Sequence, residues 1–349
     1  MTTRTADSRV PRPTMTDVAK AAGVSQTTVS FVLNNRTDVN IPHETRKRIR
    51  QAAADLGYRE NVMAQALRLG KSNLIGLVTD EIATTPYAGL IIRGMQDAAW
   101  RYSRILTLVN TDCHADMEIK AVETLLKHQV DGLLFATMFH HEIALPPILG
   151  DMPVALVNCY SADASAPAVV PDEKQGGYDA TCYLLERGHR DIGFLTKDES
   201  IPATRGRLAG YRRALAEAGL PFRDDRVVAF TGDQEAGFRG AMTLMRQPDR
   251  PSALFCFNDR LAMGAYTALQ TLGLRVPDDV SIIGFDNQEI IAAHLLPTLT
   301  TMQLPHYEMG RWGVDRLFSN TPAPAAHMLL TCPLVERNSV APLKLSITA

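Results

Sequence analysis

The sequence lacks the features that mark several classes of protein. Its five cysteines, at positions 113, 159, 182, 256 and 332, form no CxxC pair, which is typical of buried thiols in a reducing compartment. No run of about 18 consecutive apolar residues occurs, so the sequence predicts no membrane span. The N-terminus has no charged stretch followed by an apolar one, and no secretory leader is expected. These absences favour a cytoplasmic protein.

Motifs for catalysis, metals and cofactors are missing as well. No Gly-x-Ser-x-Gly turn occurs, and the run His140-His141-Glu142 lacks the HExxH spacing of a zinc site. Gly70-Lys71-Ser72 ends like a phosphate-binding loop, but Gln65 stands where such a loop needs its first glycine. No GxGxxG follows an expected strand. The sequence therefore predicts no enzyme activity, no bound metal and no cofactor.

Size and charge suggest more than one domain. The 349 residues are enough for two to three domains of roughly 150 residues each. Residues 1–72 contain 12 of the 36 basic and 6 of the 38 acidic residues, a net charge of +6. The remaining 24 basic and 32 acidic residues leave −8 on the rest of the chain. A basic end on an acidic body is expected when only that end meets phosphates.

Residues 14–35 predict two short helices joined by a tight turn. Thr14 and Asp17 have the spacing of a capping box. Gly23 is expected to end the first helix, because a residue without Cβ turns sharply at no steric cost, and Ser25 to cap the second. The apolar face of the second helix consists of Val29, Val32 and Leu33.

A third helix is expected after Pro42, with Gly57 at its C-terminal end. Taken alone, the first two helices are also compatible with an ordinary helical hairpin. The second helix, however, exposes short polar side chains suited to base edges and phosphates, and the third is crowded with basic residues. These residues are Gln26, Thr27, Thr28 and Ser30, and Arg46, Lys47, Arg48 and Arg50. Together they favour a DNA-binding unit.

From residue 73 onward, short apolar runs alternate with amphipathic helical stretches. Continuous apolar strands of this kind indicate parallel sheets covered by helices on both faces. Polar residues follow several of the expected strands, and ligands bind beyond such strand ends in doubly wound sheets. These residues are Asp80, Asp112, Lys197, Asp198, Asn258, Asp259 and Asp286. For Asp259 and its neighbours, capping the next helix is the alternative to binding a ligand.

The run from Met15 to Val78 resembles the headpiece and hinge of the lactose repressor (LacI/GalR) family of bacterial transcription regulators. The resembling pieces are Asp17-Val18-Ala19, Ala22-Gly23-Val24-Ser25, Thr28-Val29-Ser30, Leu33-Asn34, Leu56-Gly57-Tyr58, Asn61 and Ala64-Gln65-Ala66-Leu67. The resemblance extends over residues 14–340. It implies an all-α helix-turn-helix headpiece followed by an α/β core of two lobes, similar to periplasmic sugar-binding proteins and built from doubly wound parallel sheets.

The resemblance also implies a division of the chain into domains. We expect a flexible arm at 1–13, a headpiece at 14–60, a hinge and linker at 61–72, and a core at 73–345. Three crossings between the lobes are expected near Val169–Asp172, Leu296–Thr300 and Thr321–Met328. The first lobe would then comprise about 73–170 and 300–325, and the second about 172–297 and 328–345.

In such a headpiece the second helix reads bases in the major groove. Gln26 is the candidate for an adenine or guanine edge and Thr27 for a methyl or phosphate contact. Phe31 is expected either to touch a thymine methyl or to pack inward against Tyr58. Five further residues are candidate phosphate contacts: Thr14, Ser25, Thr28, Ser30 and Asn34.

The resemblance implies a hinge helix at 61–68 that folds when two headpieces sit on the operator. Asn61, Ala64 and Leu67 are its expected minor-groove residues, with Leu67 as an apolar wedge that kinks the DNA. Ordinary helix packing is the alternative role for Leu67.

For the effector, the resemblance implies contacts from Arg207, before Leu-Ala-Gly-Tyr, and from Asp286 in Gly284-Phe285-Asp286. Asn258 and Asp259 fit the family's Asn-Asp pair at a strand end. The first lobe is expected to add Tyr87 and Asp112. Carboxylates, amides and an arginine of this kind suit a polyol such as a sugar.

The expected function is a transcription regulator, favoured as a repressor, that binds a pseudo-palindromic operator as a homodimer. A small-molecule effector between the lobes, favoured as a sugar or sugar derivative, would release it. Two alternatives stay open within this class: a purine or other metabolite co-repressor, and a regulator whose core has no ligand. A sugar-binding transport receptor is disfavoured by the basic headpiece and the missing leader.

Overall fold

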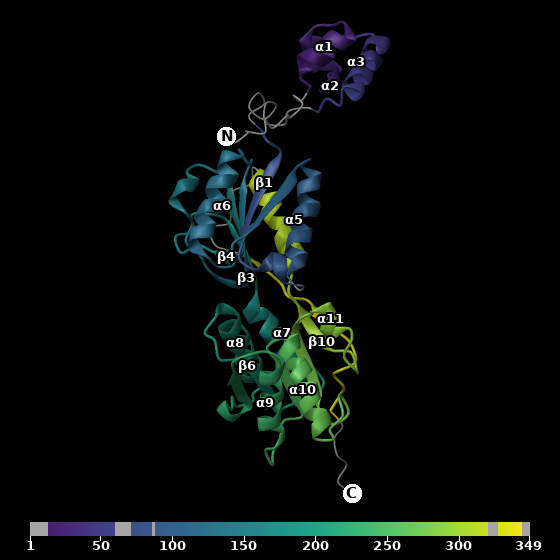
Figure 1. Ribbon diagram of the computed structural model, residues 1–349. Helices are drawn as coiled ribbons and strands as arrows, with labels where there is room; N and C mark the ends of the chain where they lie inside the picture. The colour runs from purple at the N-terminus through teal and green to yellow at the C-terminus, as the bar shows by residue number, and fades with distance from the viewer. Residues whose placement is uncertain (1–12, 60–70, 86–87, 320–326, 344–349) are drawn as a thin grey trace, which may run out of the picture. The chain divides into compact units, whose positions relative to one another are not determined.

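The computed structural model describes residues 13–59, 71–85, 88–319 and 327–343 (Figure 1). Its contacts divide the chain into two compact units, residues 1–72 and 73–349. The first unit contains the headpiece and the second the core, and each is described by itself below.

The headpiece consists of three helices: α1 (Met15–Ala22), α2 (Gln26–Leu33) and α3 (His43–Asp55). The predicted capping box is present, since the Thr14 side chain accepts from the Asp17 backbone and Asp17 accepts from the Thr14 backbone N–H. Gly23 follows α1 with φ 63°, the left-handed conformation that glycine adopts without strain. The Ser25 hydroxyl caps α2 by accepting from Thr28 N–H at 3.1 Å. Local sequence signals thus set the bounds of both helices.

A small apolar core joins the three headpiece helices. It contains Val18, Ala19, Ala22, Val29, Val32, Ile49 and Ala53, all buried. Arginines of α3 bind backbone carbonyls of the neighbouring segments: Arg48 Nε donates to Ala22 O at 3.0 Å, and Arg46 Nη2 donates to Arg36 O at 2.8 Å. Part of the headpiece's positive charge therefore fixes the arrangement of its own helices.

The first lobe of the core, called the N-lobe here, is built on a parallel sheet with strand order β11-β5-β4-β3-β1-β2. Helices α5 and α12 pack on one face and α6 on the other, as the two apolar clusters of this lobe show. The strands are β1 (Leu74–Thr79), β2 (Ile105–Asn110), β3 (Leu133–Glu142), β4 (Val154–Tyr160), β5 (Ala168–Pro171) and β11 (Met328–Leu330). The helices are α5 (Gly89–Arg101), α6 (Ala115–Lys127) and α12 (His306–Phe318), with short 3₁₀ turns at Ile82–Thr84 and Pro147–Leu149.

The second lobe, the C-lobe, has strand order β12-β10-β9-β8-β6-β7, with only β12 antiparallel to its neighbour among the described pairs. Helices α7 and α8 cover one face and α9 and α10 the other. The strands are β6 (Ile192–Lys197), β7 (Val227–Phe230), β8 (Ala253–Cys256), β9 (Ser281–Asp286), β10 (Thr300–Gln303) and β12 (Leu334–Val335). The helices are α7 (Glu173–Glu186), α8 (Pro202–Glu217), α9 (Gln234–Met245), α10 (Asp259–Thr271) and the short α11 (Glu289–Ala292), with a 3₁₀ turn at Asp224–Arg226.

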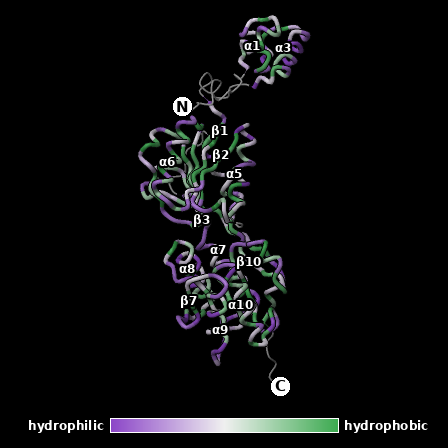
Figure 2. Tube along the Cα trace, in the orientation of Figure 1, coloured by the Kyte–Doolittle hydropathy of each residue, from purple (hydrophilic) through white to green (hydrophobic). Residues whose placement is uncertain are grey.

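Both sheets have the buried apolar strands that the sequence predicts. All four residues of β8 and the last five of β1 are buried, and Figure 2 shows hydrophobic residues gathered along the N-lobe strands around β1. Strands with both sides covered carry no polar alternation, because neither side faces water. In the part of the chain that the structure describes, no helix is long and apolar enough to cross a membrane.

The chain crosses between the lobes three times, as expected, but two crossings lie later than the sequence suggested. The first, between β5 and α7, falls where it was placed. The second follows β10, because β10 pairs with β9 in the C-lobe before α12 packs in the N-lobe. The third follows β11, because β11 pairs with β5 in the N-lobe. The expected lobe ranges are therefore corrected: residues 300–303 belong to the C-lobe and 328–330 to the N-lobe.

Candidate functional site

Helix α2 presents a polar surface from the headpiece. Gln26 and Thr27 are exposed at its N-terminal end, whereas Val29 and Val32 on the other side are fully buried. The N-terminal residues of a recognition helix are the ones that reach base edges in helix-turn-helix proteins. Two of the three predicted base-reading residues, Gln26 and Thr27, thus lie on an exposed face of a helix whose other face packs in the headpiece core.

The predicted phosphate contacts surround α2 and α1, and each makes bonds within the headpiece. Thr14 Oγ1 donates to Asp17 Oδ2 at 2.7 Å. The hydroxyls of Ser25 and Thr28 lie 2.8 Å apart. Asn34 Nδ2 donates to Ser30 O at 2.7 Å at the end of α2. These side chains therefore stabilise the helix ends. A hydroxyl group that caps a helix can also form a hydrogen bond with a phosphate.

Phe31 does not belong to the headpiece core. It is half-buried, and the guanidinium of Arg36 lies 5.5 Å from its ring centroid. Tyr58, in contrast, packs against the apolar core. Of the two expectations for Phe31, inward packing against Tyr58 does not describe this structure. The predicted minor-groove residues Asn61, Ala64 and Leu67 lie outside the described residues, as does Tyr87, a predicted effector contact.

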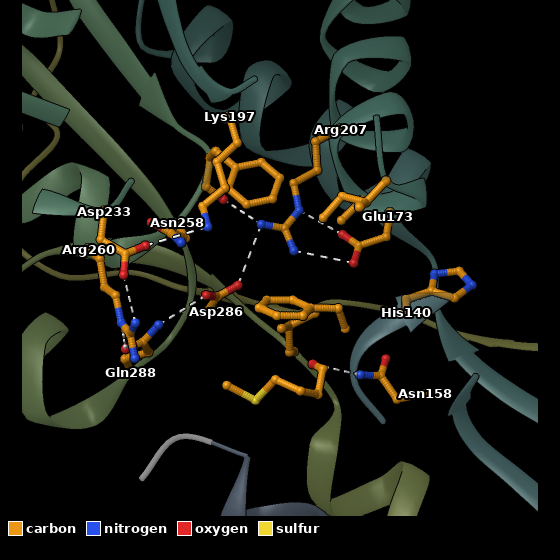
Figure 3. Close-up of a pocket in the computed structure, with 16 residues that line it drawn as sticks. His140, Asn158, Glu173, Lys197, Arg207, Asp233, Asn258, Arg260, Asp286 and Gln288 are labelled. Carbon is orange, nitrogen blue, oxygen red and sulfur yellow. Dashed lines mark hydrogen bonds and ion pairs between the residues drawn. The ribbon is translucent and has the colours of Figure 1, made fainter. Parts of the chain in front are cut away.

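A polar cleft lies between the lobes of the core, where strands of both sheets end. Its C-lobe wall is made by the ends of β6, β8 and β9 and by the first turns of α8 and α10, and its N-lobe wall by the ends of β3 and β4. The lining residues are Met138, Phe139, His140, Asn158, Glu173, Lys197, Ile201, Ala203, Arg207, Asp233, Phe257, Asn258, Arg260, Asp286, Gln288 and Leu304 (Figure 3). Three of the predicted effector contacts, Arg207, Asn258 and Asp286, are among them.

Arg207 lies at the base of the cleft and is almost completely buried. Its Nε donates to Glu173 Oε2 at 2.7 Å and its Nη2 to Glu173 Oε1 at 3.3 Å, a bidentate ion pair. Nη1 donates to the carbonyl of Phe257 and lies 3.5 Å from Asp286 Oδ1. The guanidinium also stacks on the ring of Phe285, 3.7 Å from its centroid. Arg207 is thus held rigidly, with its position set before any ligand arrives.

Asp286 lies at the end of β9 in a positive-φ conformation (99°). Burial raises the pKa of its carboxyl group to about 6, although Arg207 and a hydrogen bond from Gln288 act in the opposite direction. Gln288 Nε2 donates to Asp286 Oδ2 at 3.1 Å. The strained backbone turns the carboxylate toward Arg207 and the cleft, as Figure 3 shows.

Asn258 and Asp259 have different roles, although they are adjacent. Asn258 caps α10, its Oδ1 accepting from Leu261 N–H at 2.9 Å, and it lines the cleft. Asp259 is fully buried behind the wall, where its oxygens accept from Gln288 N–H and from the Thr301 hydroxyl, each at 2.6 Å. Burial raises the pKa of Asp259 well above its ordinary value. Asp259 therefore supports the loop that carries Gln288 and does not line the cleft.

Asp112 does not line the cleft either. It is exposed after β2 and accepts a hydrogen bond from Asn110 Nδ2. β2 is the edge strand of the N-lobe sheet, and Asp112 is not among the residues that line the cleft. Asp80 after β1 instead accepts from Met138 N–H at 2.8 Å and so holds the start of the cleft-lining segment of β3.

Several cleft residues had no role assigned from the sequence. Glu173, Asp233, Arg260 and Gln288 come from helix starts and loops, and Asn158 lies near the end of β4 with φ 58°. Lys197 was noted at a strand end without a function. For Asn158, the signal in the sequence was a polar residue ending an apolar run (Val154–Val157), the same signal that identified Asp80 and Asp286.

His140 forms part of the N-lobe wall. Burial lowers the pKa of its imidazole to about 4, with further lowering by His327 and His141. The Tyr160 ring lies edge-on to it at 5.5 Å. Among the described residues, no group of three or more His, Cys, Asp or Glu side chains is arranged to hold a metal ion.

A helix-turn-helix unit joined in one chain to a two-lobed core with a polar cleft defines a DNA-binding regulator with a small-molecule-binding domain. Residues 14–61 match the bacterial regulatory proteins of the lacI family, and residues 72–337 match the periplasmic binding proteins and sugar binding domain of the LacI family. The chain belongs to the LacI family of DNA-binding transcription regulators.

Individual relatives match over nearly the full chain. The ribose operon repressor of Haemophilus influenzae is 32% identical over 337 residues, which cover 95% of this chain and 99% of the relative. The transcriptional repressor PurR of Vibrio campbellii is 33% identical over 301 residues, 85% of this chain and 89% of the relative. The crystal structure of the lac repressor dimer bound to operator and the anti-inducer ONPF superposes with a TM-score of 0.77 at 27% identity, covering 94% of this chain and 99% of that one.

Proposed function

We propose that this protein is a repressor that binds a pseudo-palindromic operator as a homodimer and responds to a sugar or sugar derivative in the cleft. The observation that carries the proposal is the coexistence of two sites in one chain. Helix α2 exposes Gln26 and Thr27 from a capped, buried frame, and the cleft holds Arg207 and Asp286 at 3.5 Å.

A dimer is expected because one recognition helix contacts only a small part of the DNA. One recognition helix contacts only a few base pairs, so specificity needs two half-sites related by the protein's two-fold axis. Asn61, Ala64 and Leu67 are proposed to reach the minor groove between the half-sites.

The composition of the cleft supports a polyol over a purine. Asp286, Asn258 and Gln288 present oxygens and amides from the C-lobe, and carboxylates with amides match the alternating donors and acceptors of vicinal hydroxyls. Phe257 already has the Arg207 guanidinium on its ring, at 4.3 Å, so this ring is less suited to stack on a flat base. Phe139 and Met138 supply apolar surface for the C–H face of a sugar.

Effector binding is proposed to act by changing the angle between the lobes. A ligand that touches both walls favours one relative arrangement, and a regulator of this kind typically couples two sites by about 1–3 kcal/mol. The same linkage requires operator DNA to alter effector affinity by an equal factor.

Operator selection from a random DNA library tests the proposal. The expected result is an enriched motif with two inverted half-sites. Gln26→Ala should lose about 1–3 kcal/mol of binding free energy and relax preference at one position per half-site. Gln270→Ala, at an exposed position of α10, is the matched control and should reproduce the wild-type motif. An unchanged motif with Gln26→Ala would refute the role of Gln26, and no enriched motif would refute the function.

A further inference from the structure

Two cations gather on one carboxylate at the side of the cleft. Lys197 Nζ lies 3.5 Å from Asp233 Oδ1, and Arg260 Nη1 donates to Asp233 Oδ2 at 2.9 Å. Lys197 ends β6, Asp233 precedes α9, and Arg260 lies in the first turn of α10, so three separate segments build the cluster. Figure 3 shows the three side chains together on the C-lobe wall.

The side chains of Lys197 and Asp233 differ in exposure. The Lys197 side chain is only 11% exposed, whereas that of Asp233 is 41% exposed. A largely desolvated ammonium group gains most from a strong hydrogen-bonding anion. The Asp233 carboxylate is partly exposed, so water can solvate it when another anion binds the two cations. An anion entering the cleft can therefore take its place.

Two helix starts reinforce the positive potential. Asp233 stands at the N-cap of α9 and Asn258 at the N-cap of α10, and the first-turn N–H groups of helices favour anions. At the base of the cleft, Arg207 is already neutralised by the bidentate pair with Glu173. Arg207 and Glu173 thus form a balanced ion pair at the base of the cleft, while the cluster of Lys197, Asp233 and Arg260, with two cations and one carboxylate, forms a cationic wall beside it.

We propose that the effector is an anionic sugar derivative whose carboxylate or phosphate group binds Lys197 and Arg260 in place of Asp233. Its hydroxyl groups then lie on Asp286, Asn258 and Arg207. This inference rests on the proposed function, since it assumes that the cleft is the effector site, and it specifies the chemical class of the ligand.

The position of Lys197 also allows the acid group of the ligand to affect the arrangement of the two lobes. Its Nζ lies 5.9 Å from the ring centroid of Phe139, which belongs to the opposite lobe. A ligand anion held by Lys197 is therefore next to both lobes, and the charge on the ligand affects the lobe arrangement directly.

Calorimetry with the full-length protein tests the proposal. The probes are D-gluconate, D-glucuronate, D-galacturonate and D-glucose 6-phosphate, each compared with its neutral parent: D-glucitol, D-glucose or D-galactose. Hydrogen bonds to charged groups contribute about 1.5–3 kcal/mol, so at least one acid should bind about 10- to 100-fold more tightly than its parent. Comparison of the sugar acids with the phosphate identifies which acid group the wall prefers.

Variants that should change the affinity for the acid in opposite directions test the proposal further. Lys197→Met should weaken binding of the preferred acid by about tenfold or more and leave a neutral parent unaffected. Asp233→Asn should strengthen binding of the same acid, because it removes the competing carboxylate. Lys127→Met, on the exposed side of α6, should change the affinity for neither the acid nor its neutral parent. Arg260→Met should act in the same direction as Lys197→Met.

The outcomes separate this inference from the proposed function. If no acid binds more tightly than its neutral parent, or if Asp233→Asn weakens acid binding, the inference is overturned. Operator selection would still succeed in that case, because it depends on the headpiece. Loss of the operator motif would instead overturn the proposed function alone, and the measured acid affinities would still decide what the cleft binds.

Discussion

At the scale of single residues, the pairing of Arg207 with Glu173 determines which variants can test the proposed effector site. Both side chains are buried, with 2% and 7% of their area exposed. Replacing only one of them leaves an unpaired charge in the interior, which costs about 3–5 kcal/mol in comparable buried pairs. A loss of effector response in Arg207→Met alone could therefore result either from a lost ligand contact or from unfolding of the core.

The double variant Arg207→Met/Glu173→Gln separates the two effects. We expect Arg207→Met alone to lower the unfolding free energy by about 3–5 kcal/mol, and the added Glu173→Gln to recover most of that loss. Effector affinity, measured by calorimetry, should remain low in the double variant because the guanidinium is absent. Wild-type effector affinity in the folded double variant would show that Arg207 does not contact the ligand.

The carboxyl group of Asp286 predicts a dependence of stability on pH. Its pKa is raised to about 6 from the ordinary value of 3.8 by burial, so the folded protein binds this proton more tightly than the unfolded chain. The stabilisation that this raised pKa contributes to the free energy of unfolding is present below about pH 4 and is lost as the pH rises through 6. A difference of about two pKa units corresponds to about 3 kcal/mol.

His140 acts in the opposite direction over the same range, because its pKa is lowered to about 4 and its contribution is lost as the pH falls below 6.5. The effect of Asp286 is therefore measured as a difference. The unfolding free energy of the wild type minus that of Asp286→Asn, from urea titrations, should fall by about 2 kcal/mol between pH 4 and pH 7. A difference that stays constant or rises would contradict the assignment.

At the scale of elements, paired helices in the C-lobe approach each other through glycines. A Cβ added to Gly264 of α10 would lie 2.0 Å from the carbonyl oxygen of Gln234, and one added to Gly237 of α9 would lie 2.1 Å from that of Leu261. Both contacts are with backbone atoms, which cannot move aside as a side chain can. These two helices also carry Asp233 and Arg260 at their N-terminal ends, so their spacing positions the cationic wall.

Gly264→Ala should therefore destabilise the core by about 1–3 kcal/mol or more, as overpacking does in other proteins. Gly89→Ala in α5 is the control, because a Cβ there has nothing within 4 Å and alanine favours a helix by up to about 1 kcal/mol over glycine. Chemical unfolding of both variants checks the prediction. Equal stabilities would mean that the α9–α10 contact relaxes without cost.

At the scale of the whole molecule, charge is divided between the two compact units. Residues 1–72 carry +6 and the remainder −8. Proteins that neutralise six to ten phosphates lose about 10³- to 10⁵-fold in DNA affinity between 50 and 200 mM salt. We expect a loss of this order for operator binding, measured by fluorescence anisotropy across that salt range. Lys127→Met in the core should leave the salt slope unchanged, and a slope near zero would contradict binding through the basic headpiece.

The sequence identified most elements but not all of their partners. Thr14, Asp17, Gly23 and Ser25 marked the ends of α1 and α2 because helix caps depend on residues within one turn. Residues 300–303 (β10) and 328–330 (β11) were assigned to the wrong lobes, because a strand of three or four residues does not specify which sheet it joins. Which lobe a short strand belongs to depends on pairing with residues distant in the chain.

The amino-acid sequence by itself determined the headpiece and the alternating core, because these depend on local periodicity, caps and turn residues. The family was indicated by the residues between 14 and 340 that resemble it, and the family models confirm it. Only the tertiary structure decided what surrounds Arg207, whose partners Glu173, Phe257 and Asp286 are 34, 50 and 79 positions away. It also decided that Asp259 lies behind the cleft and that Lys197, Asp233 and Arg260 form one wall. Burial and charge pairing arise from packing between distant segments, and no local pattern encodes them.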